Sequence, residues 1–130
     1  MSSQVAFLAL AAGGYPSVDS AITFNNVITN HGSAYDGTSN FTCPADGIYV
    51  FTVTLMGQDE GDDEDATIMV NGVGTVRIHA STENQDTQAT NVGVVFCPAG
   101  GIVYVKANNN GFIYGGAESS FAGFLIGITA

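Results

Sequence analysis

The sequence predicts an all-β fold of the sandwich or barrel type, and three observations support this prediction. Apolar residues never keep the i, i+3, i+4 spacing of an amphipathic helix over a useful length. Short apolar runs are instead separated by Gly, Asn, Asp and Pro, the residues typical of turns. The segment TIMVNGVGTVRIHA contains Asn71-Gly72, a pair that suits a tight type I′ turn between two antiparallel strands.

The first expected strand is the apolar run VAFLAL, which small residues follow. A weak signal peptide is the alternative, but a basic segment is missing before the run. Eight further runs rich in β-branched or aromatic residues follow, each bounded by turn residues. The nine expected strands are Val5–Leu10, Ala21–Val27, Asn40–Cys43, Gly47–Met56, Ala66–Val70, Gly74–Ser81, Gln88–Cys97, Ile102–Asn108 and Ser119–Thr129.

Two of these strands, IYVFTVTLM and FAGFLIGI, are apolar on both alternating faces. A strand with one face in water alternates apolar and polar residues, so both faces of these strands must be covered. Only 11% of the residues are charged, against about 25% in ordinary soluble domains. We therefore expect the single domain, residues 1–130, to bury part of its surface against further copies of itself.

The charge balance excludes several classes of partner. Twelve acidic residues stand against only Arg77 and Lys106, which gives a formal net charge of −10. Binding to a nucleic-acid backbone needs several cations on one face, and anionic membranes disfavour such a chain for the same reason. No apolar run reaches the roughly 18 residues of a membrane span, so we expect no membrane insertion.

The spacing of aromatic, Gly and Asn residues resembles the complement component 1q globular head domain, a relative of tumour necrosis factor. The residues that carry the resemblance are Phe24, Asn30, Tyr35, Phe41, Gly47, Tyr49 and Phe51. The ending SSFAGFLI is similar to the last strand of that family, NGFIY to the preceding loop, and VAF to the first strand. The gap from Tyr35 to Phe41 is one residue shorter than in the family, and Val53 replaces an aromatic residue.

The resemblance implies a jelly-roll sandwich of two five-stranded antiparallel sheets, assembled as a homotrimer. It implies a secreted, extracellular recognition module, and Met1 would then precede a mature domain from which a signal has been removed. Our first hypothesis is a pattern-recognition lectin of innate immunity that binds cell-surface or microbial glycans or glycoproteins, sialic acid among them. The second is a structural or signalling trimer that binds a protein receptor.

Carbohydrate binding uses planar amide and carboxylate groups together with an aromatic ring, carried on loops of a rigid sandwich. The segment KANNNGFIYGGAESS supplies Asn109, Asn110, Tyr114 and Glu118, although a long polar connection explains it equally well. Arg77 and His79 share one face of a strand, either as a surface pair or as a contact for ligand. The carboxylate of a sialic acid would need Arg77 or Lys106.

Two acidic stretches are candidate calcium sites, since Ca²⁺ takes several oxygen ligands at flexible geometry. The stretch QDEGDDED contributes Asp59, Asp62, Asp63 and Asp65, without the spacing of an EF-hand loop. The stretch TENQD contributes Glu83 and Asp86, roughly where the resemblance puts calcium ligands. A solvated charged loop is the alternative for the first stretch. No cofactor is required, and calcium is the one candidate.

The phrase Cys-Pro-Ala-x-Gly-Ile occurs twice and contains both cysteines, Cys43 and Cys97. In a jelly roll these are two corners at one end of the sandwich, where proline closes each strand. The cysteines form either a disulfide or two buried thiols, and they lack the paired spacing of zinc sites. Asn40 begins a glycosylation sequon. We predict no enzymatic activity, because neither histidine lies in a nucleophile or acid–base motif.

Overall fold

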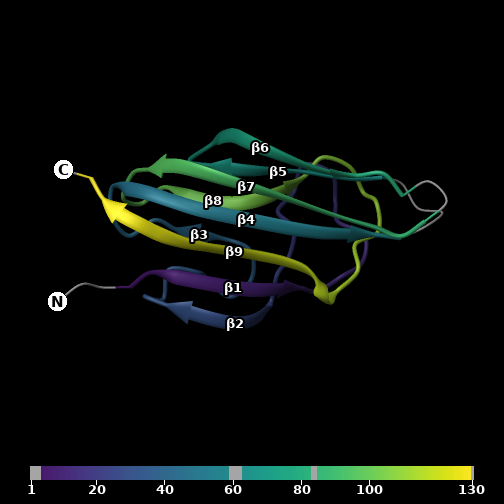
Figure 1. Ribbon diagram of the computed structural model, residues 1–130, viewed down its shortest axis with the longest axis horizontal. Helices are drawn as coiled ribbons and strands as arrows, with labels where there is room; N and C mark the ends of the chain where they lie inside the picture. Colours follow the sequence, from purple (N-terminus) through teal and green to yellow (C-terminus); the bar gives the residue numbers. More distant parts are fainter. Residues whose placement is uncertain (1–3, 59–62, 83–84, 130) are drawn as a thin grey trace.

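The structure is a computed structural model that describes residues 4–58, 63–82 and 85–129. Over these residues nine strands stack as two antiparallel sheets, and no helix is long and apolar enough to cross a membrane (Figure 1). The strands are β1 (Ala6–Ala11), β2 (Asn26–His31), β3 (Phe41–Thr42), β4 (Gly47–Gly57), β5 (Glu64–Val70), β6 (Val73–Ala80), β7 (Thr87–Cys97), β8 (Ile102–Ala107) and β9 (Gly116–Ile128).

The strand order confirms the predicted jelly-roll sandwich. One sheet has the order β2-β1-β9-β4-β7 and the other β3-β8-β5-β6. The second sheet thus has four named strands in the described part of the chain, not the five expected. Isolated bridges extend this sheet: Tyr35 pairs with Phe41 at the free edge of β3, and Ala21 pairs with Lys106 of β8, where Ile22 N donates to Val105 O at 2.8 Å.

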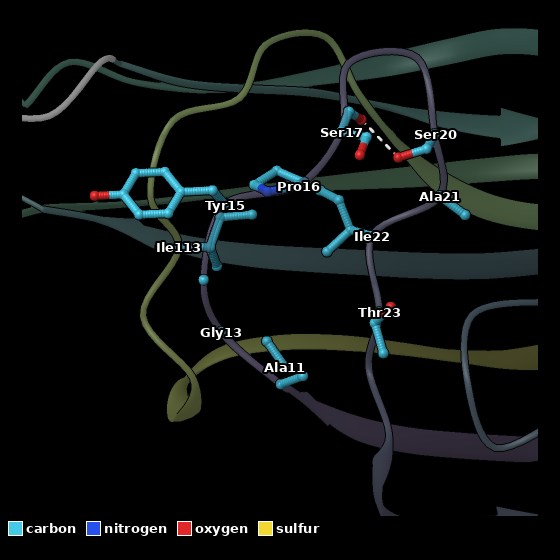
Figure 2. A pocket seen from close by; sticks show the side chains of 12 residues that line it. Ala11, Gly13, Tyr15, Pro16, Ser17, Ser20, Ala21, Ile22, Thr23 and Ile113 are labelled. Carbon is cyan, nitrogen blue, oxygen red and sulfur yellow. Dashed lines mark hydrogen bonds between the residues drawn. The ribbon is translucent and has the colours of Figure 1, made fainter.

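The prediction of a second strand over Ala21–Val27 is wrong, because β2 begins only at Asn26. Ile22 and Phe24 are both buried in the core while Thr23 between them is exposed. Figure 2 shows the chain with Ile22 and Thr23 crossing the strands instead of running along them. The segment therefore shows the alternating burial of a strand, although it pairs with β8 only at the isolated bridge between Ala21 and Lys106. β2 itself is an edge strand and mostly exposed, so its sequence lacks the alternation of a half-buried strand.

The predicted hairpin is confirmed. Val70 of β5 pairs with Val73 of β6, and the two central residues both have positive φ, 49° at Asn71 and 83° at Gly72. Positive φ at both positions defines the type I′ turn. A register shift between Thr67 and Met69 then brings Thr67 opposite Arg77 and Asp65 opposite His79.

Aromatic rings fill the space between the sheets. Phe7 stacks on Tyr35 at 4.7 Å between ring centroids and on Phe41 at 5.0 Å, and it meets Phe121 edge-on at 4.8 Å. The Tyr35 hydroxyl donates to Phe24 O at 2.6 Å, and burial raises the pKa of this phenol. The aromatic residues that carried the family resemblance are thus core residues.

The two Cys-Pro corners lie at the same end of the sandwich, as predicted. Cys43 N donates to Gly101 O and Gly100 N donates to Cys43 O, both at 2.8 Å. Cys43 and Cys97 are buried free thiols in this structure, and Cys97 Sγ donates to Pro98 O at 3.6 Å. Burial raises the pKa of both thiols. A bridge between them stays a prediction.

The outer face of the five-stranded sheet is apolar. Phe124 of β9, Val50 of β4 and Val94 of β7 lie side by side in register across it. The strands β7 and β9 expose six large apolar side chains there and at their ends: Val92, Val94, Phe96, Phe124, Ile126 and Ile128. A single copy of the chain therefore leaves its most apolar sheet face in water.

Replacing Gly123 with alanine tests the aromatic core. A Cβ at this position would lie 2.5 Å from Phe51 Cδ1 and 2.9 Å from Phe7 Cε1, so Gly123→Ala should lower the free energy of unfolding by about 1–3 kcal/mol. Gly127→Ala, on the same strand with no neighbour within 4 Å of its Cβ, is the control and should change little. Urea unfolding at matched protein concentration measures both, and equal effects would contradict this packing.

Candidate ligand-binding surface

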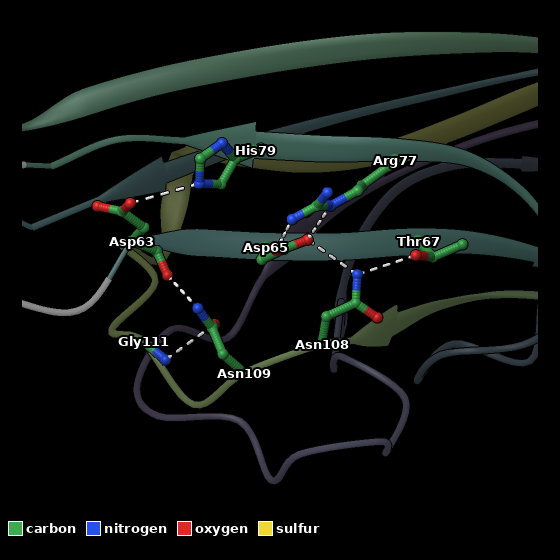
Figure 3. Close-up of polar contacts among 8 residues, drawn as sticks. All are labelled: Asp63, Asp65, Thr67, Arg77, His79, Asn108, Asn109 and Gly111. Atoms are coloured by element: carbon green, nitrogen blue, oxygen red, sulfur yellow. Dashed lines mark hydrogen bonds and ion pairs between the residues drawn. The ribbon is translucent and has the colours of Figure 1, made fainter.

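Polar side chains gather at one end of the four-stranded sheet, on its outer face (Figure 3). We call this group the polar strip: Asp63, Asp65, Arg77, His79, Asn108 and Asn109. It combines residues that the sequence had placed in two different hypotheses, a calcium site and a glycan site. The strip is assembled from β5 and the residue before it, from β6, and from the chain that follows β8.

Asp65 is the centre of one half of the strip. Arg77 donates two hydrogen bonds to its carboxylate: Nε lies 2.7 Å from Oδ1, and Nη2 donates to Oδ2. Asn108 Nδ2 donates to the same Oδ1 and to Thr67 Oγ1, each at 2.9 Å. The bond from Arg77 holds the pKa of Asp65 below its usual range. The Arg77 side chain is 63% exposed and Asp65 only 16%, so the guanidinium is the part that a ligand can reach.

Asp63 is the centre of the other half. His79 Nε2 lies 3.4 Å from Asp63 Oδ2, and both side chains are nearly half exposed. Asn109 Nδ2 donates to Asp63 O, and the Asn109 oxygen accepts from Gly111 N at 3.2 Å. Asp63 is thus contacted by His79 at its carboxylate and by Asn109 at its backbone oxygen (Figure 3). The strip thus presents donors and acceptors in a preset arrangement at the protein surface.

Both cations of the chain lie on this sheet face. Thr67 pairs with Arg77 on one side and with Lys106 on the other, so the two cations flank one threonine in the same row. Side chains directly opposite each other on neighbouring strands lie about 5 Å apart at Cβ. In a chain with a net charge of −10, the positive charge is therefore concentrated on this face.

The remaining predicted glycan residues do not join the strip. Tyr114 is half-buried and its hydroxyl donates to Asp86 Oδ2 at 3.1 Å. Glu118 lies exposed on β9, where its backbone oxygen accepts from Gln88 Nε2 at 3.0 Å, and Asn110 is exposed in the loop. The loop after β8 is therefore divided: Asn108 and Asn109 face the strip, and Tyr114 faces Asp86.

The predicted calcium residues fall into three groups. Asp59, Asp62 and Glu83 lie outside the residues that the structure describes. Asp63 and Asp65 belong to the strip, and Asp86 accepts the hydroxyl of Tyr114. Over residues 4–58, 63–82 and 85–129, His, Cys, Asp and Glu nowhere gather in threes as a metal site would need. Calcium binding stays a prediction.

Two aromatic residues near the Tyr114 loop were not identified from the sequence. Tyr15 and Phe112 contact each other, with ring centroids 5.2 Å apart, and Tyr15 is 73% exposed. Each stands beside a glycine or proline in a segment without strand alternation, GGYPS and NNGFIYGG. Turn-rich segments of this kind are typical of loops on the protein surface.

The ion pair between Asp65 and Arg77 predicts a change in the pH dependence of stability. A carboxyl group with a lowered folded-state pKa stabilises above its unfolded-state pKa, and this stability is lost as the pH falls through the folded-state value. Asp65→Asn should therefore flatten the fall in unfolding free energy between about pH 5 and pH 2, by at most about 1.4 kcal/mol per pH unit.

Denaturant unfolding across this pH range measures the effect. Glu118→Gln, which removes an exposed carboxylate away from the strip, should keep the steeper acid limb of the parent chain. If Asp65→Asn kept that limb as well, the ion pair would not contribute to stability in solution.

Comparison with known proteins gives a consistent result. The C1q domain profile matches residues 6–126. The "Complement C1q tumor necrosis factor-related protein 3" of Mus musculus is 30% identical over 127 residues, and that of Homo sapiens is 29% identical. Each match covers 95% of this chain and 51% of the relative, so the chain spans about half the length of these curated relatives.

Solved structures share the fold. The globular domain of the zebrafish complement 1qA protein superposes with a TM-score of 0.82 at 16% identity, over 97% of this chain and 99% of that one. The Eiger TNF of S. frugiperda has a TM-score of 0.78 at 10% identity, over 99% of this chain and 96% of that one. Murine APRIL at pH 5.0 has a TM-score of 0.76 at 15% identity, over 94% of this chain and 98% of that one. The jelly roll, the aromatic core and the matched profile together show that the chain belongs to the C1q domain family.

Proposed function

We propose that this C1q domain protein is a secreted, homotrimeric recognition protein that binds glycans on cells or microbes in innate immunity. The observation that carries the proposal is the polar strip, with its preset arrangement of carboxylate, amide, imidazole and guanidinium groups on an open sheet face. Sugars offer neighbouring hydroxyls that donate and accept at once, and planar groups of this kind bind them in pairs of hydrogen bonds. The strip meets that requirement without a cofactor.

An acidic sugar suits the strip better than a neutral one. Arg77 and Lys106 flank Thr67, and the guanidinium retains donors beyond the two that hold Asp65. The carboxylate of a sialic acid can accept from such a fork, whereas the rest of this acidic chain would repel an anion. Sialylated glycans are therefore the ligands that we expect to bind here.

The trimer is supported by the apolar face of the five-stranded sheet. An exposed apolar surface of this extent is unusual in a monomer, and Val94 on the edge strand β7 is 65% exposed. Three copies joined by this face would present three strips on one particle. Simultaneous contacts would then multiply a weak affinity for a single sugar.

Disrupting the apolar face tests the assembly. Val94→Asp places a carboxylate where another chain should pack, and burying an unpaired charge costs several kcal/mol, so the variant should sediment as a folded monomer. The parent chain and Val18→Asp, a control at a similarly exposed valine in the β1–β2 loop, should sediment as trimers. A monomeric parent chain at micromolar concentration would contradict the proposal.

A glycan array with matched sialylated and asialo glycans tests the ligand. Arg77→Gln removes the cation and should weaken binding to sialylated glycans by roughly tenfold or more, as for the loss of a charge-assisted hydrogen bond. Arg77→Lys keeps the positive charge and loses only the paired N–H donors of the guanidinium. Its affinity for sialylated glycans should therefore lie between those of the parent chain and Arg77→Gln. If the parent chain bound a protein receptor and no glycan at high concentration, the glycan proposal would be wrong and the alternative trimer that binds a protein receptor would replace it.

A further inference from the structure

The outer face of the four-stranded sheet carries a groove that the polar strip does not use. Its volume is about 640 Å³, within the usual range of small-molecule sites. Two side chains of β8, Ile102 and Tyr104, line it. They point outward because they alternate with Val103 and Val105, which are buried in the core. We call this site the Tyr104 groove.

Three polar side chains from separate segments also line the Tyr104 groove. They are Asp19 of the β1–β2 loop, Asn40 just before β3, and Asn71 of the β5–β6 turn. Within the described part of the chain, the side chains of Asp19, Asn71 and Tyr104 form no hydrogen bond or ion pair. A carboxylate, an amide and a phenol ring are therefore all available to a ligand in one groove. This is the combination of groups that carbohydrate binding uses.

Backbone hydrogen bonds hold both sides of the groove against β8. Asp19 N donates to Ala107 O at 2.7 Å, and Asn71 N donates to Ile102 O at 2.9 Å. The two segments that supply the polar groups are thus tied to the strand that carries Tyr104. Groups fixed in this way lose little conformational freedom when a ligand binds.

The Tyr104 groove adjoins the two cations of the chain. Lys106 lies two residues from Tyr104 on the same face of β8, which is about 7 Å along the strand. Lys106 and Arg77 flank Thr67 in one row across the sheet. Tyr104 pairs with Met69 in the next row. The positive charges and the groove therefore lie side by side on one sheet face.

The charge of Asp19 determines which kind of sugar suits each place. Asp19 is exposed, and its carboxylate would repel the carboxylate of a sialic acid in the groove. The same carboxylate can accept hydrogen bonds from two neighbouring hydroxyls of a neutral sugar. An acidic sugar is thus favoured beside Arg77 and Lys106, and a neutral sugar is favoured over Tyr104.

We propose that the Tyr104 groove binds the neutral hexose next to a sialic acid, so that the ligand of this sheet face is a sialylated oligosaccharide and not sialic acid alone. This inference rests on the proposed glycan function and names its ligand class. A hexose has an apolar face of C–H groups that packs on an aromatic ring, here Tyr104. Its hydroxyls form hydrogen bonds with carboxylates and amides, here those of Asp19 and Asn71.

Titration calorimetry with methyl α-sialoside and with both linkage isomers of sialyllactose tests the proposal. The parent chain should bind at least one sialyllactose roughly tenfold more tightly than methyl sialoside, because only the longer ligand reaches the groove. Tyr104→Ala should remove this difference and leave the affinity for methyl sialoside within about twofold of the parent value. Tyr104→Phe keeps the ring and should bind sialyllactose within about threefold of the parent chain.

A second variant tests the groove without altering the sheet. Asn71→Gly removes the amide at an exposed turn position, where glycine accepts the positive φ. It should weaken sialyllactose binding by about three- to tenfold, as for the loss of one hydrogen bond, and leave methyl sialoside binding unchanged. Tyr15→Ala is the matched control, because this exposed tyrosine lies outside the groove and should change neither affinity.

A glycan attached to Asn40 would bring the same sugar chemistry to the groove from the chain itself, since Asn40 begins a sequon. Thr42→Ala removes the sequon at an exposed side chain and keeps Asn40. The parent chain and Thr42→Ala, both secreted from animal cells, should bind sialyllactose equally. Binding by Thr42→Ala alone would mean that the attached glycan fills the groove, and it would overturn the proposal of a free ligand there.

The remaining outcomes separate this proposal from the glycan function on which it rests. Equal affinities of the parent chain for methyl sialoside and sialyllactose would overturn the groove as a subsite and leave the glycan function intact. A preference for sialyllactose that both Tyr104→Ala and Asn71→Gly retain would overturn it as well, since the hexose would then bind elsewhere. Failure to bind either ligand or any other glycan would overturn both proposals.

Discussion

The fold depends on the close packing of aromatic rings around Phe7, between the two sheets. Phe7 lies on β1, and it meets Tyr35, Phe41 and Phe121 within 5.0 Å. This packing needs Gly123, which pairs with Phe7 and Phe51 on the two neighbouring strands and leaves the space that their rings occupy. The rings of Phe7 and Phe51 can occupy this space only because β9 has no side chain at that point.

The two outer faces of the sandwich have opposite character as a consequence. In the four-stranded sheet, every second residue along a strand faces outward, and these outward residues include both cations and the strand residues of the polar strip. The other is apolar on its outer side as well, along β4, β7 and β9. A chain with 11% charged residues cannot make both faces hydrophilic, and both of its cations lie on the face that we propose meets the ligand. The apolar face is left for assembly.

Prediction from the sequence succeeded where a local rule governed the structure and failed where distant segments met. Asn71-Gly72 specified its turn because both residues accept positive φ. Residues 21–27 were misassigned because burial at the end of a sandwich gives the same alternation as burial in a sheet. The loop after β8 was treated as one site, but hydrogen bonds direct Asn109 to Asp63 and Tyr114 to Asp86.

The sequence by itself determined the all-β class, most strand positions, the hairpin and the family. Alternation, turn residues and the spacing of core aromatic residues can all be recognised in the sequence without knowing how distant segments meet. Only the tertiary structure decided which polar residues share a surface. Asp65 and Arg77 meet across a hairpin, Asn108 reaches them from β8, and Tyr15 meets Phe112 from the opposite end of the chain. Such contacts follow from strand order and register, which the pattern of residues in one strand does not specify.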